Sequence, residues 1–217
     1  TAEVYDPQTD GWQPLAKMTT ARCGVRLAAV GGKVYAIGGR DGGLPLESVE
    51  AYDPQLGAWA RVASMSRIRK AHASAVLDGK IYVIGGYALS RLDTVEVYDP
   101  QTDSWQRVAC MPQSVSGHAA AAMGGKIYVT GGAGRWTLNS VYVYDPQADA
   151  WTQVASMSIA RRGHASAVVD GKLYVFGGVS GMEQELSSVE VYDPASDSWA
   201  RGPSMASACY DLAVVAL

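Results

Sequence analysis

Several residue types are scarce in this sequence, and each shortage excludes a class of protein. The three cysteines, Cys23, Cys110 and Cys209, are odd in number and far apart, which argues against a secreted disulfide scaffold. No run of 18 apolar residues could form a transmembrane helix. The formal net charge is −3, so there is no overall attraction to nucleic acid or to an acidic membrane surface. The one asparagine, Asn139, precedes Ser-Val and is no glycosylation acceptor. We therefore expect a cytoplasmic protein without a nucleic-acid or membrane partner.

Helical periodicity is missing as well. No 11-residue window has apolar residues at helical spacing, whereas short runs rich in Val, Ile, Tyr and Trp are frequent. Such runs are typical of strands, and the sequence predicts an all-β fold.

The sequence contains a repeat, which three separate markers define. Gly-Gly pairs recur at spacings of 47, 46 and 46 residues. They are Gly38/Gly39, Gly85/Gly86, Gly131/Gly132 and Gly177/Gly178. A Tyr-Asp-Pro triplet begins at Tyr5, Tyr52, Tyr98, Tyr144 and Tyr192, and a Trp follows at Trp12, Trp59, Trp105, Trp151 and Trp199. A fixed period of this length indicates a solenoid, an array or a propeller.

One unit, best seen over residues 163–199, reads as four short strands. HASAVV and KLYVF are joined by the tight turn Asp170-Gly171, and SVEVY and SWARG follow the Gly-Gly pair. The second strand is apolar almost throughout, so both of its faces are expected to be buried. Four-stranded sheets stacked face to face around an axis make a β-propeller. Gly-Gly then allows close backbone approach, and Trp fills the space between neighbouring sheets.

Gly-Gly after an aliphatic and Tyr-containing strand, then Tyr-Asp-Pro, then Trp, resembles the Kelch repeat. The resemblance covers essentially the whole chain and implies a Kelch β-propeller of four-stranded antiparallel blades. The phrases VEVYDPQTDSW and GHASAVVDGK look like the substrate adaptors that combine BTB and Kelch domains. A shared fold does not by itself fix a function.

The repeat makes residues 1–217 a single domain. Its units are a partial one at 1–15, complete ones at 22–63, 69–109, 115–155 and 161–203, and a partial closing strand at 208–217. We expect this last segment to pair with the N-terminal half unit in a split, incomplete fifth blade. Because one strand of that blade has no counterpart, two alternatives stay open: a five-bladed ring with a defective blade, or a fragment of a six-bladed ring. The start at Thr1 in mid-pattern favours the fragment.

Partner-binding residues are expected on the face where the loops differ between units, because specificity usually lies on variable loops of a rigid scaffold. The resemblance to Kelch adaptors implies that the arginine two residues before the first-strand glycine, and the serine at the third-strand entry, contact a peptide. Arg, Tyr and Trp in these loops are typical of interface hot spots, and Arg suits the carboxylates of an acidic peptide. The candidate residues are Arg22, Arg69, Arg161, Tyr87, Arg91, Arg135, Trp136, Ser48, Ser140, Ser188 and Tyr210.

Other patterns are interpreted as structural. His72, His118 and His164 recur once per unit; equivalent positions on successive blades are too far apart to share one ion, and we expect hydrogen bonds within each blade. The paired aspartates of the Tyr-Asp-Pro segment suit turns, and the periodic methionines suit the core. No catalytic constellation or phosphate loop stands out, so no catalytic residue, cofactor or metal is predicted.

Three functions from different classes remain. The leading hypothesis is a protein-binding module, the substrate-recognition domain of a cullin-type ubiquitin ligase adaptor, whose ligase link would lie in BTB and BACK domains outside this sequence. The second is a scaffold that binds actin or a related filament. The third is an enzyme, since some Kelch propellers are oxidases or sugar-acid isomerases; Cys209 and Tyr210, the one Tyr/Cys neighbour pair, have no matching histidine for a copper oxidase.

Overall fold

The computed structural model describes residues 2–215, and within that range it contains strands and turns but no helix. The strands are β1 (Glu3–Asp6), β2 (Gly11–Pro14), β3 (Arg26–Val30), β4 (Lys33–Ile37), β5 (Arg40–Asp41), β6 (Leu44–Pro45), β7 (Val49–Asp53), β8 (Ala58–Val62), β9 (Ala73–Leu77), β10 (Lys80–Ile84), β11 (Val95–Asp99), β12 (Ser104–Val108), β13 (Ala119–Met123), β14 (Lys126–Ala133), β15 (Thr137–Asp145), β16 (Ala150–Val154), β17 (Arg161–Arg162), β18 (Ala165–Val169), β19 (Lys172–Phe176), β20 (Val179–Ser180), β21 (Val189–Asp193) and β22 (Ser198–Gly202).

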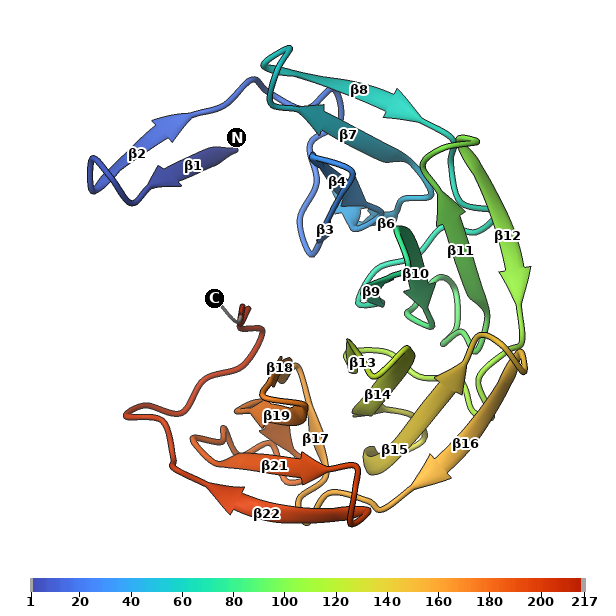
Figure 1. The fold of residues 1–217 in the computed structure, drawn as a ribbon, viewed down its shortest axis with the longest axis vertical. Coiled ribbons are helices and arrows are strands. Elements are labelled where there is room, and N and C mark those ends of the chain that lie inside the picture. Colours follow the sequence, from blue (N-terminus) through green and yellow to red (C-terminus); the bar gives the residue numbers. More distant parts are fainter. Residues whose placement is uncertain (1, 216–217) are drawn as a thin grey trace.

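Four antiparallel four-stranded sheets form the blades of a propeller, as the repeat predicts. Blade 1 has the strand order β3-β4-β7-β8, blade 2 β9-β10-β11-β12, blade 3 β13-β14-β15-β16 and blade 4 β18-β19-β21-β22. In Figure 1 the first strand of every blade lies nearest the axis and the fourth lies on the rim. The expected all-β propeller with four complete blades is therefore confirmed.

The turn between the first and second strands has the chemistry that the sequence predicts. Asp78 and Gly79 both have positive φ, 49° and 72°, and Asp170 and Gly171 repeat this with 50° and 70°. Two successive residues in the left-handed region make the hairpin turn whose twist suits antiparallel strands. Aspartate and glycine tolerate that region best.

The Gly-Gly pairs allow neighbouring chain segments to touch. Gly86 has φ 102°, and a Cβ placed on it would lie 2.8 Å from Cβ of His72 and 2.9 Å from the carbonyl oxygen of Lys70. Any larger residue would push the second strand away from the segment that enters the first strand. This close approach fixes the positions of the loops that follow.

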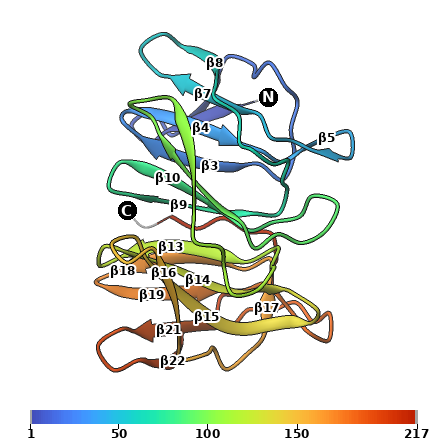
Figure 2. The ribbon, with the colours of Figure 1, turned by 90° about the vertical axis from the view of Figure 1, so that its right-hand side faces the viewer.

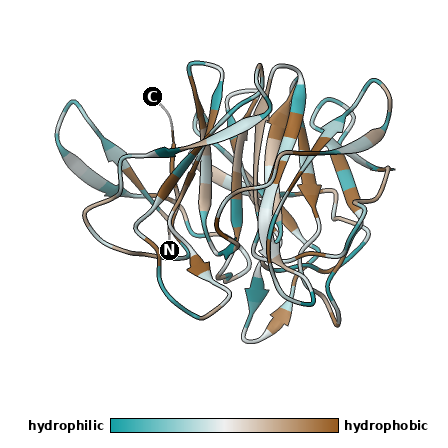
Figure 3. Cartoon of the chain, turned by 90° about the horizontal axis from the view of Figure 1, so that it is seen from below, coloured by the Kyte–Doolittle hydropathy of each residue, from teal (hydrophilic) through white to brown (hydrophobic). Residues whose placement is uncertain are grey.

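The core lies between successive blades. One cluster joins blades 2 and 3 through Ile84, Val97, Ile127 and Tyr144, and similar clusters join blades 1 and 2 and blades 3 and 4. Long hydrophobic stretches, brown in Figure 3, fall on the strands. The periodic methionines Met65, Met111 and Met157 are buried, as expected of core residues.

A hydrogen-bonded staple at the rim links each blade to the one before it. Asp103 Oδ1 accepts hydrogen bonds from the Tyr98 hydroxyl at 2.7 Å and from the amide of Ala63 in the preceding blade at 2.8 Å. Trp105 Nε1 donates to the carbonyl oxygen of the same Ala63 at 2.8 Å. The same contacts recur for the sets Tyr144, Asp149, Trp151 and Ala109, and Tyr192, Asp197, Trp199 and Ala155. The Tyr-Asp-Pro-to-Trp motif thus holds the ring together.

The split fifth blade is only loosely formed, because residues 2–215 lack the strand pairing expected to close the ring. Within residues 2–215, β1 and β2 pair only with each other, and residues 208–215 form no strand; Figure 1 shows the hairpin and the C-terminal segment apart. The first and third strands of a blade are separated by the second, about 9.6 Å across two strand spacings, so without a second strand they have no backbone contact. Residues 1, 216 and 217 of the two predicted partial units lie outside the described residues.

The C-terminal segment lies against blade 4 as the segment entering each blade lies against the blade before it. The Asp211 amide donates to the carbonyl oxygen of Gly163 at 2.7 Å, and the Gly178 amide donates to that of Cys209 at 2.9 Å. The Gly86 amide donates to the carbonyl oxygen of Val115 in the same way, and the Gly163 amide to that of Gly117.

In the N-terminal hairpin Trp12 is 68% exposed. Gly57 of blade 1 stands where blades 2–4 have the staple aspartate, and the buried indole N–H of Trp59 finds no hydrogen-bond acceptor among residues 2–215. The staple between this hairpin and blade 1 is therefore missing.

Candidate functional site

The two ends of the propeller differ in character. One end, here called the turn face, carries the repeated Asp-Gly and Tyr-Asp-Pro turns, where Lys80 pairs with Asp99 at 3.1 Å and Asp99 Oδ1 accepts the Gln101 amide. The other end, the loop face, consists of the segments entering the first strands and the loops after Gly-Gly; β5 and β17 lie on this side in Figure 2. The turn-forming role expected for the aspartates is confirmed. The loops after Gly-Gly on the loop face differ more in sequence between units than the turns of the other face do.

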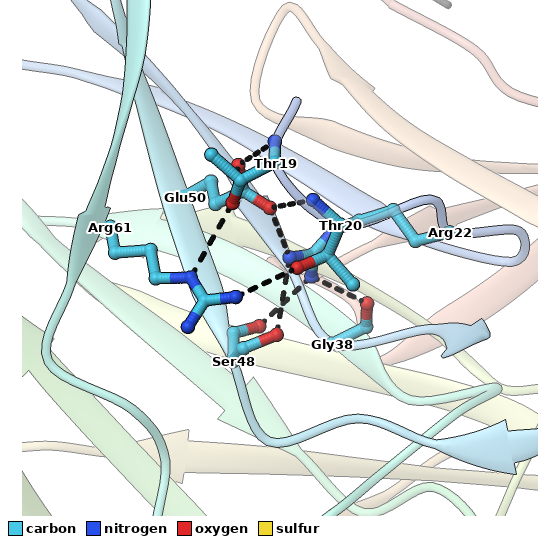
Figure 4. Close-up of polar contacts among 7 residues, drawn as sticks. All are labelled: Thr19, Thr20, Arg22, Gly38, Ser48, Glu50 and Arg61. Carbon is cyan, nitrogen blue, oxygen red and sulfur yellow. Dashed lines mark hydrogen bonds and ion pairs between the residues drawn. The ribbon is translucent and has the colours of Figure 1, made fainter. Parts of the chain in front are cut away.

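A buried ion pair supports the loop face from inside blade 1 (Figure 4). Arg22 Nη2 lies 2.7 Å from Glu50 Oε1, and both side chains are fully buried. Arg22 Nη1 also donates to the carbonyl oxygens of Gly38 and Ser48, each at 2.9 Å. Glu50 accepts the amides of Thr19 and Thr20. The pair therefore ties together the entry segment, the Gly-Gly end of β4 and the start of β7.

The charge of this network is stabilised by its hydrogen bonds. Burial raises the pKa of Glu50, but the hydrogen bonds from Arg22, Thr19 and Thr20 outweigh it and leave the pKa below its usual value. Burial lowers the pKa of the corresponding arginines Arg69 and Arg161, but from a reference so high that both stay protonated. A buried charge is tolerated when it is paired and hydrogen-bonded; here both Nη atoms of each arginine have partners, while Nε has none within residues 2–215.

The expectation that these arginines contact a partner is corrected by their burial. Arg69 pairs with Glu96 and Arg161 with Glu190, and each arginine donates to the Gly-Gly end of its own blade. The hydroxyls of Ser48 and Ser188 accept from Arg22 and Arg161, inside the same networks. In this structure the three arginine side chains build the blades and do not face the solvent above the loops. Ser48 and Ser188 are half-buried, and their contact with a partner stays a prediction.

Blade 3 lacks both the arginine and the glutamate of the ion pair that the other three blades contain. Val115 takes the arginine position and is fully buried, and Tyr142 takes the glutamate position beside it. Ser140 accepts a hydrogen bond from Gln113 instead, at 3.0 Å. Blade 3 thus has an apolar contact where the other blades have an ion pair. Ser140 is half-buried, and its contact with a partner stays a prediction.

The remaining candidates are exposed on the loop face. Tyr87 and Arg91 lie on the loop of blade 2, Arg135 and Trp136 on that of blade 3, and Tyr210 on the C-terminal segment. Trp136 is 73% exposed. The Arg135 guanidinium lies 5.8 Å from the Trp136 ring centre, a cation–π distance. Large apolar side chains that stand free on protruding loops are available for contact with another molecule.

A hollow of about 410 Å³ lies among these loops and spans blades 2, 3 and 4. Arg91, Arg135 and Arg162 line it, together with Trp136 and a single acidic residue, Glu183. Arg162 Nη2 contacts both carboxylate oxygens of Glu183, one of them at 2.8 Å. Among residues 2–215, neither Arg91 nor Arg135 forms an ion pair. The hollow is therefore positively charged and partly filled by a carboxylate of the chain itself.

A second hollow, of about 500 Å³, opens at the mouth of the central channel. Its lining includes Cys23, Arg26, Arg40, Lys70 and Asp211. Arg40 Nε lies 3.1 Å from Cys23 Sγ, and Lys70 Nζ lies 5.6 Å from the Tyr87 ring centre. This region extends the positive charge of the loop face toward the axis.

The repeated histidines are buried packing residues. A Cβ placed on Gly85 would lie 2.9 Å from Cε1 of His118, so the ring packs directly on the Gly-Gly end of the preceding blade. The His164 ring shares a hydrogen bond with Thr130 Oγ1 at 2.8 Å, across blades and not within one as expected. Burial lowers the pKa of His118 and His164 to about 3. Nowhere in residues 2–215 do three His, Cys, Asp or Glu side chains gather as a metal site would require.

Two features of the loop face were missed by sequence reasoning. The Arg–Glu pairs could have been found by comparing units, because Glu50, Glu96 and Glu190 accompany arginine while Tyr142 accompanies Val115. The Arg162–Glu183 contact had no such signal, since Glu183 lies in a loop whose sequence is not repeated.

Comparison with known proteins agrees with the repeat. Residues 19–136, more than half of the chain, match the family model described as FKB95, Kelch-repeats domain, and residues 160–206 match the Kelch motif. The part of the chain that the structure describes contains no helix long and apolar enough to cross a membrane.

Three curated proteins are similar to this chain over about the length of one repeat. Kelch-like protein 5 of Homo sapiens is 45% identical over 47 residues, which are 22% of this chain and 6% of that protein. Kelch repeat and BTB domain-containing protein 8 of Xenopus tropicalis is 47% identical over 51 residues, 22% of this chain and 8% of that protein. The influenza virus NS1A-binding protein homolog of Mus musculus is 45% identical over 42 residues, which are 19% of this chain and 6% of that protein. The matches thus span less than a tenth of the length of these relatives.

Proposed function

Because this chain belongs to the Kelch-repeat family, whose propellers bind protein partners, we propose that its loop face is the protein-binding surface. One observation carries the proposal. The exposed apolar residues Leu89, Trp136 and Met182 protrude from the loops of three successive blades, 90%, 73% and 87% exposed. Beside them lie Arg91 and Arg135, which form no ion pair within residues 2–215. Large apolar and arginine side chains of this kind supply most of the binding energy at protein interfaces.

We further propose that the bound protein is a substrate of a cullin-type ubiquitin ligase. The support is the resemblance of the repeats to adaptors with BTB and Kelch domains, and the name of one relative, which includes a BTB domain. The ligase link would be made by domains outside this sequence. This propeller would select the substrate and take no part in the chemistry.

A cytoskeletal scaffold is the alternative within the same binding class. An actin-binding propeller would co-sediment with filaments, whereas a degradation adaptor would bind a soluble protein. An enzyme is disfavoured because the family is a protein-interaction type and because its repeated histidines are buried at blade interfaces.

The test is a pull-down from cell lysate with matched variants on the two faces. Leu89→Ala with Trp136→Ala removes two apolar side chains from the loop face. Leu56→Ala with Val169→Ala removes two exposed apolar side chains from turns on the opposite face. We expect the first double variant to lose partners that the wild type captures and the second to keep them, with unchanged far-UV circular dichroism for both.

The adaptor role needs a separate readout. Excess isolated propeller would occupy a substrate without delivering it to the ligase, so the half-life of that substrate in cells should lengthen. The loop-face double variant should have no such effect. Equal capture by both double variants would exclude the loop face, and a captured partner whose turnover never changes would exclude the adaptor role.

A further inference from the structure

The positively charged hollow on the loop face indicates which chemistry it recognises. Its three arginines come from three different blades: Arg91 from the loop of blade 2, Arg135 from that of blade 3 and Arg162 from the segment entering blade 4. Rigid blades hold these segments, so the three guanidinium groups face one space without folding rearrangement. Guanidinium groups pair with carboxylates through charge-assisted hydrogen bonds.

The chain itself places a carboxylate in this space. Both oxygens of Glu183 contact Nη2 of Arg162, yet 73% of the Glu183 side chain is exposed. Glu183 also has φ 59°, a left-handed backbone that is unfavourable for a residue other than glycine. The Glu183 side chain is thus mostly exposed and lies on a loop with a strained backbone, whereas the Arg162 side chain that it contacts is 38% exposed.

We infer that this hollow binds a carboxylate of an acidic partner segment and that Glu183 occupies the same arginine when no partner is bound. The inference rests on the proposed function of the loop face and specifies its ligand. The partner carboxylate takes the place of the Glu183 carboxylate on Arg162. Arg91 and Arg135, which have no ion-pair partner in residues 2–215, donate hydrogen bonds to neighbouring acidic groups of the same segment. Trp136 at the rim packs on the apolar part of the same segment.

Glu183 therefore acts as an internal competitor. An exposed ion pair is only modestly stable, so its displacement should lower the affinity for a partner by a small factor, about 2- to 5-fold. Removing the competing charge should raise the affinity by that factor, but only while Arg162 is present. This dependence on Arg162 separates direct competition from a general effect of charge.

The experiment measures fluorescence anisotropy with a labelled peptide of alternating Glu and Gly, and a counterpart with Gln for Glu, at low ionic strength. The variants are Glu183→Gln, Arg162→Gln, the two combined, and Glu185→Gln. The last is the matched control, since Glu185 is an exposed residue of the same loop and its loss changes the net charge equally.

We expect the wild type to bind the Glu peptide at least tenfold more tightly than the Gln peptide. Glu183→Gln should tighten binding of the Glu peptide more than Glu185→Gln does, and the gain should vanish when Arg162→Gln is also present. Equal effects of the Glu183 and Glu185 changes would overturn the competition. Equal binding of the two peptides would overturn the carboxylate site.

The outcome is separable from that of the proposed function. If the loop face captures a protein whose binding is insensitive to the changes at Arg162 and Glu183, the inference fails and the proposed function stands. If the Glu peptide binds as expected but the loop-face double variant captures the same proteins as the wild type, the proposed function fails and the carboxylate site stands.

Discussion

Arg161 and Glu190 form an ion pair at 2.8 Å inside blade 4, and the arginine side chain has no contact with solvent. Removing one partner leaves the other charge buried without compensation, which typically costs about 3–5 kcal/mol. We expect Arg161→Ala to lower the free energy of unfolding by about that amount in urea denaturation.

Blade 3 provides the control for this prediction. It carries Val115 and Tyr142 at the corresponding positions, so Arg161→Val combined with Glu190→Tyr should be markedly more stable than Arg161→Ala. A loss of less than about 1 kcal/mol for Arg161→Ala would show that water reaches the pair, and the arginine would again be a candidate for partner contact.

Asp149 tests the staple between blades. Its Oδ1 accepts hydrogen bonds from Tyr144 and from the Ala109 amide, and these lower its pKa. The backbone φ is 46°, near the 62° of Gly57 at the equivalent position. Asp149→Gly therefore removes the side chain without adding backbone strain. We expect it to lower the free energy of unfolding by about 1–3 kcal/mol. The reverse change, Gly57→Asp, gives the Tyr52 hydroxyl an acceptor and should not lower the stability of the protein. Thermal unfolding of both variants is the measurement, and equal destabilisation by both would contradict this prediction.

Ala71 tests the backbone conformation at the channel mouth. Its φ is 50°, whereas Gly24, Gly117 and Gly163 occupy the equivalent positions with φ between 60° and 64°. The left-handed region costs a non-glycine residue about 1–2 kcal/mol, part of which the greater freedom of unfolded glycine offsets. Ala71→Gly should raise the unfolding free energy by up to about 1 kcal/mol. Ala73→Gly, two residues on in β9, should instead lower it, and stabilisation by both changes would contradict this reasoning.

Acid should destabilise the fold before its carboxylates titrate. Because burial lowers the pKa of His118 and His164 to about 3, the unfolded chain binds more protons than the folded one below about pH 6.5. The free energy of unfolding is therefore highest above pH 6.5. As the pH is lowered from 6.5 towards the folded-state pKa, it decreases by about 1.4 kcal/mol per pH unit for each histidine.

The measurement is urea denaturation at pH 7, 6 and 5, where the turn aspartates with lowered pKa remain ionised in the folded state. Val25 occupies the histidine position of blade 1, so His118→Val is the matched variant. This variant should reduce the slope of the unfolding free energy against pH by the amount that corresponds to one bound proton. An unchanged slope would mean that His118 can be protonated in the folded protein.

The fold was predictable from the sequence because its signals are local and repeated. The Gly-Gly pair, the Asp-Gly turn and the Tyr-Asp-Pro-to-Trp motif each act over a few residues, and their common period fixes the order of the blades. The site was only partly predictable. Trp136 and Arg91 were expected on the loop face and lie there, whereas Arg22, Arg69 and Arg161 lie inside the blades, because a repeat marks residues that every blade needs for packing as clearly as residues that bind.

The sequence by itself determined the strand order and the turns, since each depends on residue types at short, fixed spacing. Only the tertiary structure decided which charges are buried and which are free. Arg161 and Arg162 are neighbours in sequence, yet one is paired inside blade 4 and the other lines a hollow shared by three blades. Strand alternation turns successive side chains to opposite sides, and the partner each one meets, Glu190 or Glu183, depends on how separate segments pack.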